Sequence, residues 1–255
     1  MLWYKAWLET RWRFLIGLAV MTIVACGTVF DYPAVAKLMP YVPSVDAPGP
    51  MGQIFKRAIE VQRDYRGFIW WQWFRQNLLQ LWTFFAILLG SGGLLSTSSG
   101  GAAVFMLSLP VSRKRLLEAR AGAGLLEALV LAVVPSLVVP LVSPAIGQTY
   151  RIADVVAHGV CLFVVGSMFF ALAFLLSTAF SDVWRPLLIA CGVAIVIGVC
   201  EPFLVPSPYY GVFGAMSGEM YFRAGQWPWL ALGAGAVATS ALLYGSGVRL
   251  RRQDF

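Results

Sequence analysis

Charged side chains are scarce in this sequence. Only 12% of its 255 residues are Asp, Glu, Lys or Arg, whereas a soluble domain has about 25%. Hydrophobic residues make up 59% of the chain and the mean hydropathy is +0.75. This composition excludes an ordinary soluble domain and predicts an integral membrane protein long enough for several crossings, since each helical crossing needs roughly 20 apolar residues.

Residues that carry enzyme chemistry are also few. The single histidine, His158, lies near Asp154 with no obvious nucleophile beside it, which indicates a structural or interfacial role. The carboxylates are scattered, so no metal site is predicted. The four cysteines match no CxxC or zinc spacing and are interpreted as small buried hydrophobes: Cys26, Cys161, Cys191 and Cys200. We therefore expect no catalytic centre, and a chain that is not itself an enzyme.

Glycine-rich stretches do not form a nucleotide-binding loop. The sequence GSGGLLSTSSGG at 90–101 lacks the Gly-Lys-Ser/Thr ending of a phosphate loop, and that ending occurs nowhere in the chain. The stretch GAGAVA at 233–238 loosely fits a dinucleotide fingerprint but lies inside an apolar run with no strand before it. Close packing of helices through small residues explains this stretch better.

Six apolar runs are long enough to be membrane spans. They are continuous and lack the period-two alternation of lipid-facing strands, so we expect helices. The fold class is therefore an all-α membrane protein with a single polytopic domain over 1–255. The expected spans are about 14–30, 71–95, 119–144, 155–179, 186–205 and 228–247.

The distribution of Lys and Arg indicates that both termini are cytoplasmic. In the short loops, five basic residues fall on the side of the termini and two on the other, and short loops decide orientation. The opposite topology is the weaker alternative. The basic residues on the cytoplasmic side would be Lys5, Arg11, Arg13, Arg113, Lys114, Arg115, Arg120, Arg185, Arg249, Arg251 and Arg252.

Two segments outside the spans have a predicted structure. Residues 2–13 place aromatic and apolar side chains near one helical face, which predicts an amphipathic helix in the cytoplasmic interface before the first span. A simple aromatic and basic flank of that span is the alternative. The outer loop 31–70 contains prolines that break a helix over its first half, followed by a short amphipathic helix over 51–65.

Four polar residues could line a translocation path, and the main candidates are Glu127, Asn77 and Gln80. Glu127 is expected inside the third span, where a carboxylate is costly and faces the bundle interior or a wet cavity. If that span starts nearer Leu125, Glu127 is only a boundary residue. Asn77 and Gln80, with Thr83, fall along one face of the second span and could line the same interior.

A dense cluster of charge near the middle of the chain is in the sequence LSLPVSRKRLLEARAGAGLL, residues 107–126. It follows a glycine break and a short apolar segment, 102–109. The arrangement resembles the link between the second and third transmembrane helices of type-2 ABC transporter permeases, where LSLPVSR before a basic or polar helix start recurs. The aromatic second span and the basic tail RLRRQDF are also similar to that family. Where many members carry an acid and a Gly-Thr pair, this chain has SSGG at 98–101.

The resemblance implies a transport function and its partners. The chain would be the permease subunit of an ATP-driven exporter in the plasma membrane, such as a bacterial inner membrane. It would pair with a second permease copy and with a separate ATPase subunit that binds ATP and magnesium. Segment 102–109 would be the coupling helix that docks on the ATPase, and 110–115 would start the third span. The residues implied in coupling are Phe105, Met106, Leu107, Leu109, Pro110, Arg113, Lys114 and Arg115.

Physical chemistry is compatible with this assignment. A short apolar helix at the boundary can fill a groove on a soluble partner, and the arginines can meet carboxylates or anionic headgroups. Alternatively, the arginines only enforce topology. A second hypothesis is a non-transporting membrane protein, such as an intramembrane enzyme or an assembly factor, which would require paired polar groups at matching depth. Nothing in the sequence predicts nucleic-acid binding.

Overall fold

The computed structural model describes residues 2–38, 59–92, 113–180, 182–204 and 211–251, and within them it is helical with no strand. Five of these helices are long and apolar enough to cross a membrane. The chain is thus a helical membrane protein, as its composition predicted. The five are α1 (Leu2–Leu38), α6 (Arg113–Val142), α7 (Ile152–Ser177), α8 (Trp184–Leu204) and α11 (Trp229–Arg251).

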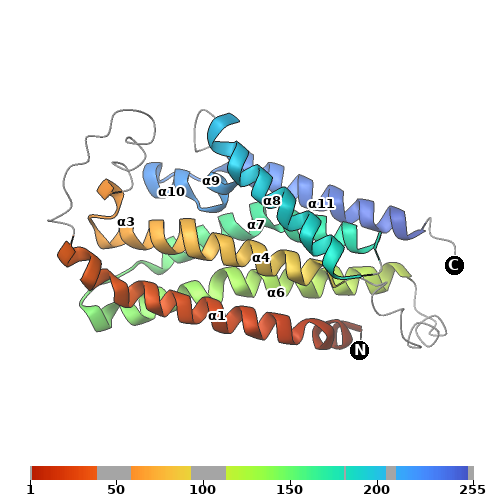
Figure 1. Cartoon of the computed structure of the whole chain (residues 1–255), viewed down its shortest axis with the longest axis horizontal. Helices are drawn as coiled ribbons and strands as arrows, with labels where there is room; N and C mark the ends of the chain where they lie inside the picture. Colours follow the sequence, from red (N-terminus) through yellow and green to blue (C-terminus); the bar gives the residue numbers. More distant parts are fainter. Residues whose placement is uncertain (1, 39–58, 93–112, 181, 205–210, 252–255) are drawn as a thin grey trace.

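The expected span 71–95 has a more complex structure. It falls in a run of three helices, α3 (Tyr65–Ile69), the π-helix η2 (Trp70–Asn77) and α4 (Leu78–Gly90). None of the three is long enough on its own to count as a span, so the predicted number of six is not confirmed. The run lies along the bundle beside α1 and α6 (Figure 1).

The first helix differs from the prediction at both ends. It is continuous over Leu2–Leu38, so there is no separate interfacial helix before the first span. A charged residue of this segment also contacts another helix of the bundle: Glu9 pairs with Arg120 of α6 at 3.2 Å. At its other end α1 continues through Pro33, so the predicted loop 31–70 begins later. Residues 39–58, which include most of the predicted outer helix, lie outside the described residues.

The first residues of α1 and the last residues of α11 lie at the same end of the bundle (Figure 1). We call this the terminal end and the opposite one the far end. Two short helices, α9 (Val212–Met216) and α10 (Glu219–Ala224), lie at the far end. The short 3-10 helix η3 (Ser143–Ile146) follows α6.

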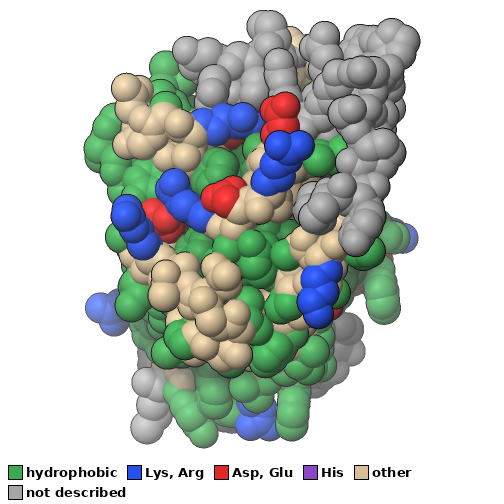
Figure 2. All heavy atoms as spheres, turned by 90° about the vertical axis from the view of Figure 1, so that its left-hand side faces the viewer, with side chains coloured by type: hydrophobic (Ala, Val, Ile, Leu, Met, Phe, Trp, Pro, Cys, Tyr) green, Lys and Arg blue, Asp and Glu red, His purple; other side chains and the backbone are tan. Residues whose placement is uncertain are grey.

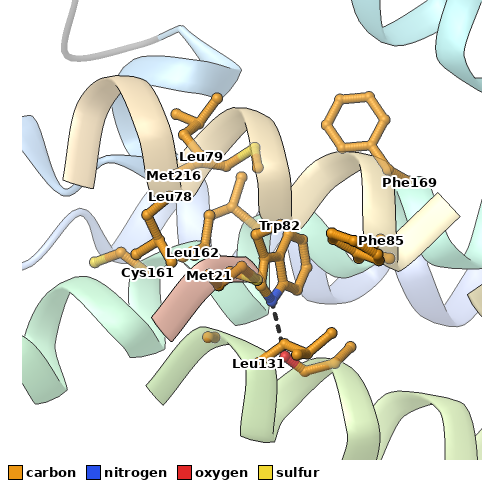
Figure 3. Packing of buried hydrophobic residues seen from close by; sticks show 14 of the residues in the cluster. Met21, Leu78, Leu79, Trp82, Phe85, Leu131, Cys161, Leu162, Phe169 and Met216 are labelled. Carbon is orange, nitrogen blue, oxygen red and sulfur yellow. Dashed lines mark hydrogen bonds between the residues drawn. The ribbon is translucent and has the colours of Figure 1, made fainter. Parts of the chain in front are cut away.

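The core is packed around α4 and α7. The Trp82 ring is fully buried and its Nε1 donates a hydrogen bond of 2.8 Å to the Ala128 carbonyl of α6 (Figure 3). A β-carbon at Gly166 of α7 would lie only 2.4 Å from this ring. The Trp82 ring therefore fits between α4 and α7 because the facing residue is glycine.

Small residues also bring α11 against α7. A β-carbon at Gly235 would lie 2.7 Å from the Val165 Cα, whereas at Gly233 nothing lies within 4 Å. The interpretation of GAGAVA as a helix-packing surface is confirmed. By contrast, α8 lies obliquely across the bundle and keeps large apolar side chains such as Leu188 and Phe203 exposed (Figure 1).

Candidate functional site

A cavity of about 570 Å³ lies between α4 and α8. This volume is within the range of about 300–1,000 Å³ typical of sites for small molecules. Its apolar walls include Phe84 and Ile195, both exposed, so the cavity opens on the side of the bundle. The lining residues are Arg75, Leu79, Gln80, Thr83, Phe84, Ile87, Cys191, Ala194, Ile195, Gly198, Glu201, Pro202, Phe213 and Gly214.

Polar groups in the cavity lie along α4 and at its far end. Gln80 is exposed and Thr83 is buried, with the Thr83 hydroxyl donating to the Leu79 carbonyl at 2.7 Å. At the far end, Glu201 of α8 accepts hydrogen bonds from the backbone N–H groups of Phe213 (2.9 Å) and Gly214 (3.2 Å). The carboxylate thereby ties the end of α8 to the start of α9.

Arg75 is held rigidly at the same end. Its guanidinium donates to the Glu219 carboxylate of α10 at 2.5 Å and lies over the Trp71 ring, 4.9 Å from its centroid. Glu219 also accepts from Arg223 at 2.9 Å, and its side chain is 2% exposed. A buried carboxylate with two cationic partners is satisfied, and leaving those partners without it would be costly.

The far-end face of the bundle carries charged side chains of both signs. Positive and negative side chains lie next to one another among apolar ones (Figure 2). Besides the Arg75–Glu219 pair, Arg66 of α3 contacts Asp154 of α7 at 3.0 Å. These pairs connect α3 and η2 to α7 and α10, so the far end is closed by charge-assisted contacts.

His158 has structural partners at the far end. The side chain is buried, and its Nδ1 lies 3.0 Å from the Ser217 carbonyl between α9 and α10. The same carbonyl accepts a hydrogen bond of 3.2 Å from the indole N–H of Trp70. The ring also packs on Phe74 at 4.5 Å between centroids. His158 thus helps to fix the α9–α10 connection, as the predicted structural role implies.

Tyr150, between η3 and α7, carries a buried hydroxyl without a hydrogen-bond partner. We expect Tyr150→Phe to be neutral or to raise the free energy of unfolding by up to about 1 kcal/mol, because it removes an unsatisfied polar group. Burial raises the pKa of the Tyr150 phenol above its ordinary value of 10.0. The unfolded phenol therefore loses its proton first, and above about pH 10 the native protein loses stability that the variant retains.

Thermal unfolding of the detergent-solubilised protein at pH 7 and pH 10.5 measures both effects. A loss of more than about 1 kcal/mol in Tyr150→Phe at pH 7 would mean that the hydroxyl has a stabilising partner. If raising the pH to 10.5 lowered the stability of both proteins equally, ionisation of the Tyr150 phenol would not be the cause of the loss.

The four residues that could line a translocation path lie in three places. Gln80 and Thr83 line the cavity. Asn77 points toward α1, where its Nδ2 lies 3.5 Å from the Thr28 hydroxyl. Side chains three residues apart on a helix differ in direction by about 60°. This difference places Asn77 and Gln80 in separate spaces between helices. Glu127 is buried between α6 and α1, accepting a hydrogen bond of 2.6 Å from Thr10.

The predicted coupling residues lie mostly outside the described residues, from Phe105 to Pro110. Helix α6 begins at Arg113, within the predicted start at 110–115, and Arg115 is exposed. A nearby feature was missed from the sequence: Arg13 of α1 donates to the Leu88 carbonyl at the end of α4, at 3.1 Å. The sequence carries no signal for this contact, because the acceptor is a backbone carbonyl 75 positions away on another helix.

Within the described ranges, no group of three His, Cys, Asp or Glu side chains could hold a metal ion. The four cysteines are free. Glu201 and Glu219 were not predicted as site residues, although Glu201 lies shortly before the proline- and glycine-rich segment 206–227 and Glu219 lies within it. Comparisons of the chain with protein-family models, with curated proteins and with solved structures find no match.

Proposed function

We propose that this chain is the membrane-spanning permease subunit of an ATP-driven exporter of the type-2 ABC transporter kind. It would work with a second copy of itself and with an ATPase on another chain, which binds ATP and magnesium. The motif LSLPVSR at 107–113 supports the family, and the side-opening cavity between α4 and α8 supports the transport role.

The cavity is the observation that carries the proposal. Its walls are apolar, a row of polar groups runs along α4 through Gln80 and Thr83, and Arg75 and Glu201 lie at one end. This combination suits a molecule with an apolar body and a polar group, entering sideways from the bilayer. Ionisable residues of transmembrane segments that face a cavity often mark substrate paths.

The orientation follows from the same proposal. We place the run α3–η2–α4 as a sixth crossing, with both termini cytoplasmic in the plasma membrane. The basic residues at the start of α6 and the end of α11 then lie on the inner side, where positive charge is favoured.

Coupling to the ATPase would act through the segment between α4 and α6. The segment follows directly on α4, which forms one wall of the cavity, and leads into α6. At the terminal end, the side chains of Arg13 and Arg120 lie beside Gly92, just after α4. A push on 102–109 would therefore be transmitted to the wall that carries Gln80.

Co-purification with an ATPase encoded beside this chain tests the proposal. We expect Phe105→Asp with Leu107→Asp to reduce the retained ATPase at least tenfold, about 1.4 kcal/mol of association energy, since charge disrupts an apolar contact. Leu38→Asp is the matched control, because Leu38 is exposed at the far end of α1. Unchanged retention in the double variant would refute the coupling segment. Failure of the unaltered chain to retain any ATPase would favour the assembly-factor or enzyme alternative.

A further inference from the structure

A second cavity, of about 510 Å³, lies at the terminal end between α6 and α11. Its lining residues come from α6 and α11, and none of them lines the α4–α8 cavity. We call it the α6–α11 groove. Its lining residues are Leu117, Glu118, Ala121, Gly122, Leu125, Leu243, Tyr244, Gly247, Val248 and Leu250.

The groove exists because α11 packs against α7 and scarcely against α6. At Gly247, a β-carbon would meet only the Leu117 Cδ2 atom, at 4.0 Å. Leu117 and Leu250 are buried and form the floor, while Tyr244 is 76% exposed and forms part of the rim. From position 117 to 125 the groove follows α6 for about 12 Å, long enough for part of an extended hydrocarbon chain.

Positive charge is concentrated where the groove ends. Helix α6 begins with the sequence RKR at 113–115, and α11 ends with RLR at 249–251. Of these, Arg115 and Arg249 are exposed. Glu118 is the single acidic residue among those that line the groove. An apolar slot that leads to a cluster of basic residues is complementary to a molecule with a hydrocarbon chain and an anionic headgroup.

We propose that the α6–α11 groove binds an anionic phospholipid of the adjacent leaflet. One acyl chain lies along Leu117, Leu125 and Leu243. The phosphate is met by Arg115 near the start of α6 and Arg249 near the end of α11. The lipid fills the gap that α11 leaves beside α6 and so fixes the last turns of α11. This proposal does not depend on transport, since it concerns a site of the chain by itself.

The experiment uses the full chain purified in detergent and stripped of lipid. Dioleoyl phosphatidylglycerol and dioleoyl phosphatidylcholine are added separately, and the melting temperature and the number of lipids retained in native mass spectrometry are measured. We expect phosphatidylglycerol to raise the melting temperature more than phosphatidylcholine, with one tightly held molecule per chain. Because the headgroup is anionic, the difference should shrink at high salt.

Two glycines of α11 provide a matched pair of variants. Gly247→Leu projects a side chain into the groove and should weaken phosphatidylglycerol binding about tenfold, because it displaces buried methylene groups. Gly233→Leu makes the same change where nothing lies within 4 Å and should leave binding unchanged. In lipid-free detergent, Gly247→Leu should melt no lower than the unaltered chain, which separates lost binding from lost folding.

A third variant works in the opposite direction. Glu118→Gln removes the acidic residue of the lining and should tighten phosphatidylglycerol binding by about twofold to threefold, a gain that misfolding would not produce. Equal effects of phosphatidylglycerol and phosphatidylcholine would overturn the claim that the site prefers an anionic headgroup. Equal binding by Gly247→Leu and the unaltered chain would overturn the groove as the site. A third outcome would also overturn the groove as a lipid site: the unaltered chain retains no lipid, and Gly247→Leu stabilises the lipid-free chain. That result would indicate that another part of the chain or a partner fills the groove.

Discussion

Replacing Gly235 by leucine is expected to lower the free energy of unfolding by about 3 kcal/mol, at the upper end of the usual cost of overpacking. The reason is that the neighbour is backbone. A β-carbon at this position would lie 2.7 Å from the Val165 Cα and 3.0 Å from the Val164 carbonyl oxygen. Backbone atoms of α7 cannot turn aside as a side chain can, so α11 must move away from α7.

Gly233→Leu is the control for this prediction. It lies on the same helix, two residues earlier, with nothing within 4 Å of its β-carbon. We expect a change within about 0.5 kcal/mol, as for substitutions that touch nothing. Thermal unfolding of both variants in one detergent gives the comparison. Equal melting temperatures would show that α11 does not pack on α7 through Gly235.

Loss of the Glu219 charge is the second large effect. Glu219→Gln keeps the size of the side chain but leaves the guanidinium groups of Arg75 and Arg223 without their shared carboxylate. Breaking a buried pair costs about 3–5 kcal/mol. Because both arginines are about one-third exposed, water compensates part of this loss, and we expect about 2 kcal/mol.

An exposed pair in the same chain provides the comparison. Asp182 and Arg185 are in contact at 3.2 Å with both side chains substantially exposed, so Asp182→Asn should cost at most about 0.5 kcal/mol. Thermal unfolding measures both variants. If Glu219→Gln were no more destabilising than Asp182→Asn, the buried charge network would not hold α10 to the bundle.

Hydropathy was sufficient to locate the long helices. The expected spans 155–179 and 186–205 correspond to α7 and α8, which occupy Ile152–Ser177 and Trp184–Leu204. Long apolar runs permit little other than a helix in a bilayer, so this part of the fold follows from local composition. The small-residue stretch in α11 was also interpretable, because close helix contacts need small side chains.

Features decided by tertiary contacts were not predictable in the same way. The aromatic and apolar face of residues 2–13 suggested an interfacial helix, yet Glu9 in this segment lies against Arg120, more than 100 positions away in the sequence. The π-helix over Trp70–Asn77 divides a run that hydropathy reads as one span. Glu219 acquires its role only from two arginines, one of them on η2. Such partners cannot be paired from one sequence without knowledge of the packing.

The most direct test of the proposed transport role is the rate of ATP hydrolysis by the partner ATPase, reconstituted with this chain in lipid nanodiscs. Gln80 is exposed in the α4–α8 cavity, and Gln76 is exposed outside it. If hydrolysis depends on movement of α4 against α8, Gln80→Trp should lower the rate about tenfold, or about 1.4 kcal/mol in barrier, while Gln76→Trp leaves it unchanged. A rate that is the same with and without this chain, and the same in both variants, would contradict the account.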